Sequence, residues 1–146
     1  MLSLPSLAVF EQLYIFLSAL VAIAIWLQMR LLRKNNGKIP DSSLFHTLSF
    51  FDSIWILISA AALYFLEFKG LSVTVPVIYG VFTFLGFFDT ARAIKNHGGM
   101  PERPEDIVFD RRYLSFRNGF ALVFFGLCMT VFLSYHLELP FLNTLL

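Results

Sequence analysis

The residues best suited to chemistry are charged side chains inside long apolar stretches. They comprise two acids and two bases: Asp52, Asp89, Arg92 and Arg117. If these stretches cross a bilayer, each central charge costs about 2.5–3.5 kcal/mol and should face the bundle interior or a water-filled cavity. Asp89 and Arg92 are three residues apart, close enough for an ion pair on one helix. We therefore predict one cluster in which the four charges neutralise one another.

Such a cluster has two readings. It is either a buried salt-bridge network that fixes helix register or anchors a partner, or a pathway on which Asp52 or Asp89 binds a cation or a proton. Glu11 lies near the start of the first apolar run and Glu138 near the end of the last, both away from the four-charge cluster. In an oligomer, they could ring an outer pore mouth.

A second set of residues has the small side chains that let two helices approach closely. This set is Ser59, Gly80, Thr83 and Gly86. Small residues at such positions pack helices within one bundle or between subunits. We predict that these four residues serve helix packing.

Recognised catalytic motifs do not occur in the sequence. It has no glycine-rich phosphate loop, HExxH, CxxC or GxSxG pattern. With one Cys and three scattered His, we expect no metal site and no cofactor. The net charge of +1 gives no reason to expect nucleic acid as a partner. We expect a protein that is not an enzyme, the alternative being a small membrane enzyme that uses Asp52 as acid or base.

The elements that must position these side chains are four long apolar runs. The chain is 58% apolar and only 14% charged, whereas about a quarter of the residues in soluble domains are charged. A helix needs about 20 apolar residues to cross a bilayer. The runs that meet this length cover about 7–32, 44–66, 71–94 and 113–141. We predict an all-α integral membrane protein, with residues 1–146 forming a single four-span domain.

The distribution of basic residues predicts how the spans are oriented. Ten of the eleven Lys and Arg lie in or beside loops 33–43 and 95–112, and Lys69 alone lies on the other side. Basic loops stay in the cytoplasm, which places both termini on the outer side of an up-down bundle. The compartment that we expect is a bacterial-type plasma (inner) membrane.

The longest connection suggests a role in binding. Residues 95–113 mix acids and bases with two prolines, as in an extended docking surface for a cytoplasmic protein. One four-helix bundle of this size is too small for a private substrate cavity. We therefore predict a subunit of a homo- or hetero-oligomeric membrane assembly, surrounded by lipid. The main alternative is an oligomeric ion channel or membrane-depolarising effector, with intramembrane acids lining a pore.

Overall fold

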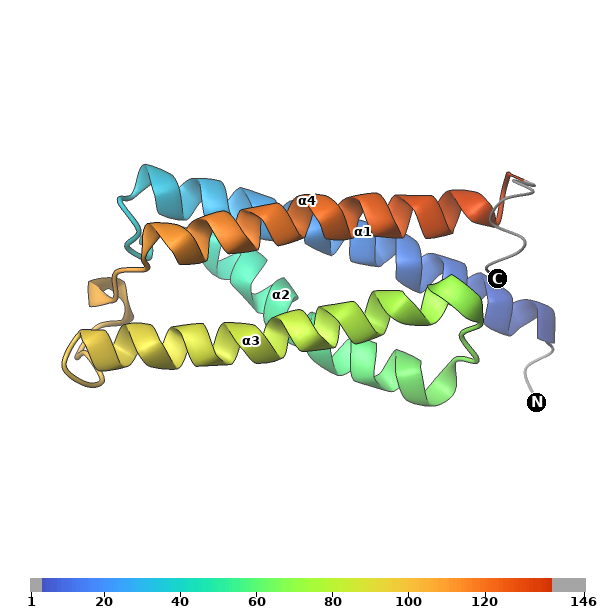
Figure 1. Ribbon diagram of the computed structural model, residues 1–146, viewed down its shortest axis with the longest axis horizontal. Coiled ribbons are helices and arrows are strands. Elements are labelled where there is room, and N and C mark those ends of the chain that lie inside the picture. Colours follow the sequence, from blue (N-terminus) through green and yellow to red (C-terminus); the bar gives the residue numbers. More distant parts are fainter. Residues whose placement is uncertain (1–3, 138–146) are drawn as a thin grey trace.

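The computed structural model describes residues 4–137, and side chains from residue 8 onward. It contains four α-helices and two short 3-10 helices: α1 (Leu4–Lys34), α2 (Ser43–Phe65), η1 (Gly70–Val73), α3 (Thr74–Asn96), η2 (Pro104–Asp106) and α4 (Arg111–Ser134) (Figure 1). Within residues 4–137 there is no strand, only an isolated bridge between Lys38 and Val108. Each of the four α-helices is long and apolar enough to cross a membrane. The prediction of an all-helical protein with four such helices is confirmed.

The helix boundaries differ from the predicted spans mainly in the second half of the chain. Residues 70–73 form η1 instead of the start of α3, since the Ser72 hydroxyl bonds to the backbone of Lys69. The last helix begins at Arg111, where the Asp110 side chain caps the Arg112 amide. This helix ends at Ser134, earlier than predicted, and the amides of Tyr135 and His136 donate to carbonyls three residues before them. The predicted continuation over 138–141 lies outside the described residues.

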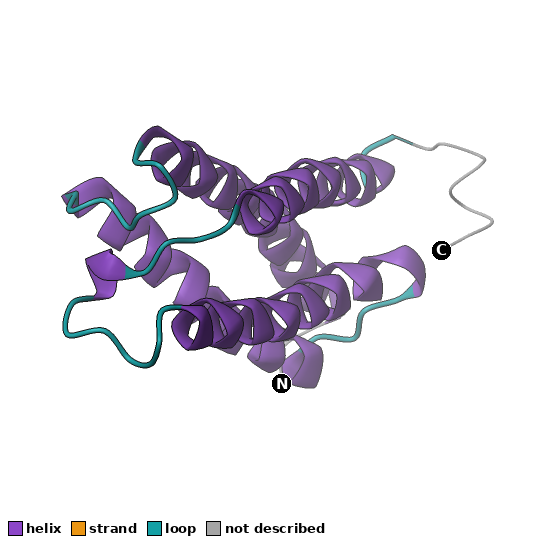
Figure 2. Cartoon of the chain, turned by 60° about the vertical axis from the view of Figure 1, so that its left-hand side comes forward, coloured by secondary structure: helices purple, strands orange, loops and turns teal. Residues whose placement is uncertain are grey.

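Helix α1 is the central helix of the bundle. Half of the residues in its most apolar 18-residue stretch are buried. In the other three helices, the corresponding share is 17–28%. Its most extensive contact is with α4, while α2 crosses it obliquely and α3 packs mainly on α2 (Figures 1 and 2). The connections 35–42 and 97–110 lie together at one end of the molecule, which we call the charged end.

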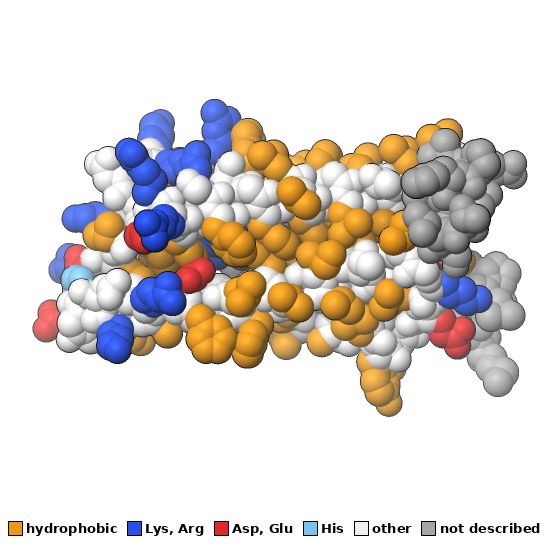
Figure 3. Space-filling model, in the orientation of Figure 1, with side chains coloured by type: hydrophobic (Ala, Val, Ile, Leu, Met, Phe, Trp, Pro, Cys, Tyr) orange, Lys and Arg blue, Asp and Glu red, His pale blue; other side chains and the backbone are white. Residues whose placement is uncertain are grey.

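The outer surface of the helices is largely apolar. Large side chains that point outward include Phe50, Phe51, Phe87 and Phe88, each more than half exposed. Figure 3 shows hydrophobic side chains along the length of the molecule, with most of the visible Lys, Arg, Asp and Glu at the charged end and a few at the opposite end. This is the surface expected of a bundle whose solvent is lipid, because water would strongly disfavour so much exposed apolar area.

Polar contacts between α1 and α2 lie within the apolar core. The Tyr14 hydroxyl donates to Ser59 Oγ at 2.8 Å, and the Trp55 indole donates to Ser18 Oγ at 3.2 Å. The Tyr14 and Trp55 rings stack with their centroids 5.6 Å apart. Ser59 therefore contributes to helix packing through a hydrogen bond as well as through its small size.

Replacing Tyr14 with Phe should lower the free energy of unfolding by about 0.5–1.5 kcal/mol, because Ser59 loses its donor while the ring stacking remains. Unfolding of the purified protein by SDS titration in mixed micelles measures this difference. Tyr64→Phe is the matched control, since Tyr64 is 83% exposed and should leave the free energy unchanged. Equal effects of the two substitutions would contradict the prediction.

Candidate functional site

An ion pair joins α2 and α4 inside the bundle. Arg117 Nη2 lies 2.9 Å from Asp52 Oδ2, and the two side chains are only 15% and 17% exposed. The second guanidinium nitrogen of Arg117, Nη1, donates to the Tyr113 hydroxyl at 2.8 Å. The Tyr79 hydroxyl, from α3, lies 2.7 Å from both Asp52 Oδ1 and the Asp52 carbonyl oxygen and donates to them. Side chains from three helices thus meet at one carboxylate.

The surroundings of this ion pair fit the demands of a buried charge. Removing two charges from water costs several kcal/mol per ion, and extra hydrogen bonds must offset part of that cost. Tyr79 supplies such a bond to Asp52, and the Arg117 guanidinium also lies over the Phe82 ring at 5.0 Å. Arg117 Nε is buried and has no hydrogen-bond partner among the described residues. The ion pair joins α2 to α4, and the bond from Tyr79 adds α3.

A groove opens beside the ion pair, between α2, α3 and α4. Its volume is about 360 Å³, and its lining includes Asp52, Ser53, Ile56, Phe82, Thr83, Gly86, Phe87, Thr90 and Arg117. The hydroxyls of Ser53, Thr83 and Thr90 each donate to the carbonyl four residues earlier. Their hydroxyl protons are already used, so these small side chains can only accept hydrogen bonds from a molecule in the groove. We call this groove the ion-pair groove.

The glycines predicted to pack helices do not do so within this chain. A Cβ atom added at Gly80 or at Gly86 would meet no atom within 4 Å. Gly86 lines the ion-pair groove together with Thr83. We predicted that these residues pack helices within one bundle or between subunits. The first use, close contact within the bundle, is absent at both glycines.

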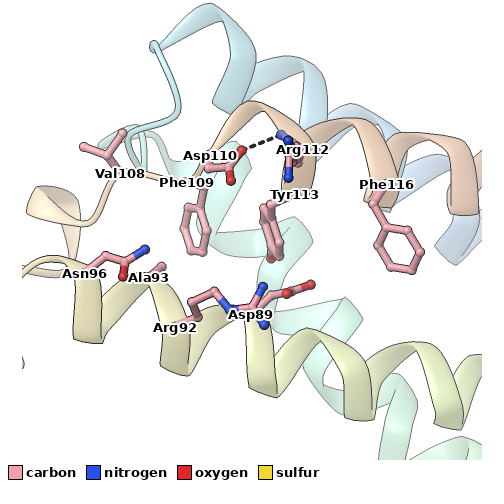
Figure 4. A pocket seen from close by; sticks show the side chains of 10 residues that line it. All are labelled: Asp89, Arg92, Ala93, Asn96, Val108, Phe109, Asp110, Arg112, Tyr113 and Phe116. Atoms are coloured by element: carbon pink, nitrogen blue, oxygen red, sulfur yellow. Dashed lines mark hydrogen bonds between the residues drawn. The ribbon is translucent and has the colours of Figure 1, made fainter.

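Asp89 and Arg92 belong to a different pocket from Asp52 and Arg117. This pocket, the end pocket, lies at the charged end and has a volume of about 290 Å³ (Figure 4). It is lined by the end of α3, the segment before α4 and the start of α4: Asp89, Arg92, Ala93, Asn96, Val108, Phe109, Asp110, Arg112, Tyr113 and Phe116.

The predicted four-charge cluster is therefore divided between two sites. Within the described residues, the Asp52–Arg117 contact is the one salt bridge, and Asp89 and Arg92 do not pair. Arg92 is exposed at the mouth of the end pocket. An ion pair exposed in this way gains little over solvation, which explains why spacing alone does not enforce the bond.

The two connections at the charged end are tied to each other. The Phe109 amide donates to the Gly37 carbonyl at 2.9 Å, and Lys38 pairs with Val108. Gly37 has a φ of +82°, and a Cβ there would lie 2.5 Å from the Phe109 carbonyl oxygen. The Phe109 ring stacks on Tyr113 with the centroids 4.6 Å apart. Gly37 thus sets the position of one wall of the end pocket.

The acid predicted at an outer pore mouth has a partner within the chain. The Tyr135 hydroxyl donates to Glu11 Oε1 at 2.6 Å, which links α1 to the end of α4. Glu138 lies outside the described residues. Among residues 4–137, no group of three or more His, Cys, Asp or Glu side chains is placed to hold a metal ion.

Comparisons with models of protein families, with curated proteins and with solved structures find no match to this chain. Any functional argument therefore depends on the arrangement of its own residues. Sequence reasoning missed the parts played by Tyr79, Tyr113 and Gly37. The role of Tyr79 could have been expected, because a tyrosine deep in an apolar run needs a hydrogen-bond partner for its buried hydroxyl.

Proposed function

We propose that the chain is a small multi-pass subunit of a membrane assembly. In this proposal the four helices form an up-down bundle, with the charged end in the cytoplasm and both termini outside. The ten basic residues in or beside the two connections of that end support this orientation. A bacterial-type inner membrane is the compartment that the proposal assumes.

The observation that carries the proposal is the uncovered ion-pair groove. Gly86 and Thr83 line it, and small side chains of this kind let a second helix approach closely. We propose that a helix of a second copy, or of another membrane subunit, fills the groove.

The proposed docking of a cytoplasmic partner uses the segment 97–110, which projects beyond α3 and α4 (Figure 1). Its outward side chains include Met100, Glu102 and Arg103. The hydrogen bond from Phe109 to Gly37 holds the end of this segment that precedes α4. A preordered loop loses less conformational freedom on binding than a free one.

Photo-crosslinking tests whether a protein occupies the groove. Phe87 lines it, and p-benzoylphenylalanine, which is close to Phe in shape, can replace this residue. Irradiation in cell membranes and in proteoliposomes of the purified chain should give a discrete protein adduct. An adduct at twice the mass of the chain in proteoliposomes identifies a second copy.

Phe88 is the matched control for this experiment, because it is a phenylalanine on the same helix, 58% exposed, that does not line the groove. The probe at Phe88 should attach to lipid and give at most about a tenth of the protein adduct, since a lipid-facing helix surface has no fixed protein neighbour. If neither membrane preparation gives a protein adduct at Phe87, the proposal is wrong.

The two alternatives have weaker support. A pore lined by Asp52 or Glu11 needs carboxylates free to meet ions, yet Arg117 pairs with the first and Tyr135 bonds the second. An enzyme that uses Asp52 as acid or base meets a similar objection, because both carboxylate oxygens of Asp52 already accept hydrogen bonds, from Tyr79 and Arg117. Ion flux through liposomes that contain the purified chain would revive the channel.

A further inference from the structure

The end pocket holds charged and polar side chains that have no hydrogen-bond partner among the residues that the structure describes. No hydrogen bond or salt bridge within the described residues engages the side chains of Asp89, Arg92, Asn96 or Arg112. The Asp110 carboxylate bonds only the Arg112 backbone amide. Figure 4 shows Asp89 and Arg92 on the same side of α3, facing the rings of Phe109 and Tyr113. The guanidinium groups of Arg92 and Arg112 and the carboxylate of Asp89 are therefore available to a ligand in the pocket.

The pocket lies at the depth where lipid headgroups would be. It covers the last two turns of α3, from Asp89 to Asn96, which rise by about 10 Å. On α4 it covers about the first one and a half turns, with Arg112, Tyr113 and Phe116. In a bilayer that these helices cross, their ends lie in the polar layer about 5–8 Å thick outside the hydrocarbon.

An apolar track leads from the pocket towards the middle of the helices. On α3, Leu85 and Val81 come one and two turns before Asp89, and they are 44% and 55% exposed. On α4, Phe116 and Val123 lie two turns apart on one side, and they are 48% and 74% exposed. Figure 3 shows hydrophobic side chains over α3 and α4 beside the charged end. A polar pocket continued by an apolar track matches an amphiphile with a headgroup and acyl chains.

We propose that the end pocket binds the headgroup of a phospholipid that carries both a phosphate and a primary ammonium group, as phosphatidylethanolamine does. Arg92 and Arg112 hold the phosphate, and Asp89 accepts from the ammonium group. Paired acids and bases in one pocket suit a zwitterion, whereas the carboxylates repel a purely anionic headgroup. A quaternary choline has no N–H to donate, so it fits less well.

The lipid site is separate from the ion-pair groove. The residues that line the end pocket and those that line the groove do not overlap, and they lie on different flanks of α3. Lipid binding therefore does not depend on the proposed partner helix. The photo-crosslink at Phe87 and the lipid measurement can fail independently.

Native mass spectrometry of the full chain in detergent tests the site. The protein is titrated with phosphatidylethanolamine, phosphatidylglycerol and phosphatidylcholine that have identical acyl chains. The unsubstituted protein should retain phosphatidylethanolamine about five- to tenfold better than the other two, the effect of one charge-assisted hydrogen bond. Equal retention of the three lipids would overturn the proposal.

Substitutions assign the headgroup contacts. Arg92→Gln with Arg112→Gln should weaken phosphatidylethanolamine binding about tenfold or more, because both phosphate ligands are lost. Asp89→Asn should remove the preference for phosphatidylethanolamine over phosphatidylglycerol. Lys95→Gln is the control, an exposed base on α3 that does not line the pocket, and it should leave retention unchanged.

All these side chains are at least partly exposed, and circular dichroism with size-exclusion chromatography checks that each variant is folded. If folded Arg92→Gln/Arg112→Gln binds lipid like Lys95→Gln, the end pocket is not the site. If Asp89→Asn keeps the preference for phosphatidylethanolamine, the proposed ammonium contact is wrong.

Discussion

Replacing Asp52 with Asn is expected to lower the free energy of unfolding by about 3–5 kcal/mol, because Arg117 is then buried without a counter-ion. The Asn amide has one acceptor oxygen, and no charge, in place of the two carboxylate oxygens that accept from Tyr79 and Arg117. The pair joins helices from distant parts of the chain, so the loss should loosen α2 and α4 together.

The partner substitution decides whether the cost comes from the unpaired charge. Asp52→Leu combined with Arg117→Met replaces both charges with apolar side chains, and it should recover most of the stability lost in Asp52→Asn. SDS titration in mixed micelles supplies the free energies. Asp41→Asn, an exposed acid in the first connection, is the control and should change stability by less than about 0.5 kcal/mol. A double variant as unstable as Asp52→Asn would show that the pair matters for a reason other than charge.

Gly37→Ala should cost about 2–3 kcal/mol and free the segment that forms one wall of the end pocket. The positive φ of Gly37 strains any other residue by about 1–2 kcal/mol. The new Cβ must also displace the Phe109 carbonyl, and the hydrogen bond from Phe109 to Gly37 adds about 1 kcal/mol when it breaks.

Gly98→Ala is a matched control for this substitution. Gly98 has a φ of +93°, but a Cβ there would meet no atom within 4 Å. It should therefore show the strain alone, without the displacement of a neighbouring backbone. Hydrogen exchange at the Phe109 amide gives a second measurement, because only Gly37→Ala should accelerate it. Unchanged protection of that amide would contradict the role given to Gly37.

Apolar run length predicted the four helices because the requirement for crossing a bilayer is local: each run must supply enough consecutive apolar residues. The first run was predicted to end near residue 32 for the same local reason, and the positive φ of Asn36 and Gly37 follows the end of α1. Pairing of charges is not local in this sense. Asp52 and Arg117 are 65 residues apart, and their contact depends on how α2, α3 and α4 pack.

The charged end shows the same limit. Spacing along one helix suggested an ion pair between Asp89 and Arg92, but the open pocket beside them lets both remain solvated. The charges and prolines of the segment 97–110 predict an exposed, extended loop. In the structure, however, Ile107 is only 7% exposed and the Phe109 amide donates to the Gly37 carbonyl. Nothing in the sequence near Gly37 indicates that its neighbour comes from a segment about 70 residues later.

The close packing of α1 on α4 has a consequence for how the protein is made. The first of the four helices to leave the ribosome finds its most extensive contact in the last. Until α4 is synthesised, Phe16 of α1 lacks its contact with the Phe132 ring, and Glu11 lacks the hydrogen bond from Tyr135. Contacts between segments so far apart form late, because the intervening chain must first be in place. The core of this bundle is therefore complete only after the last helix has been made, although its central helix is made first.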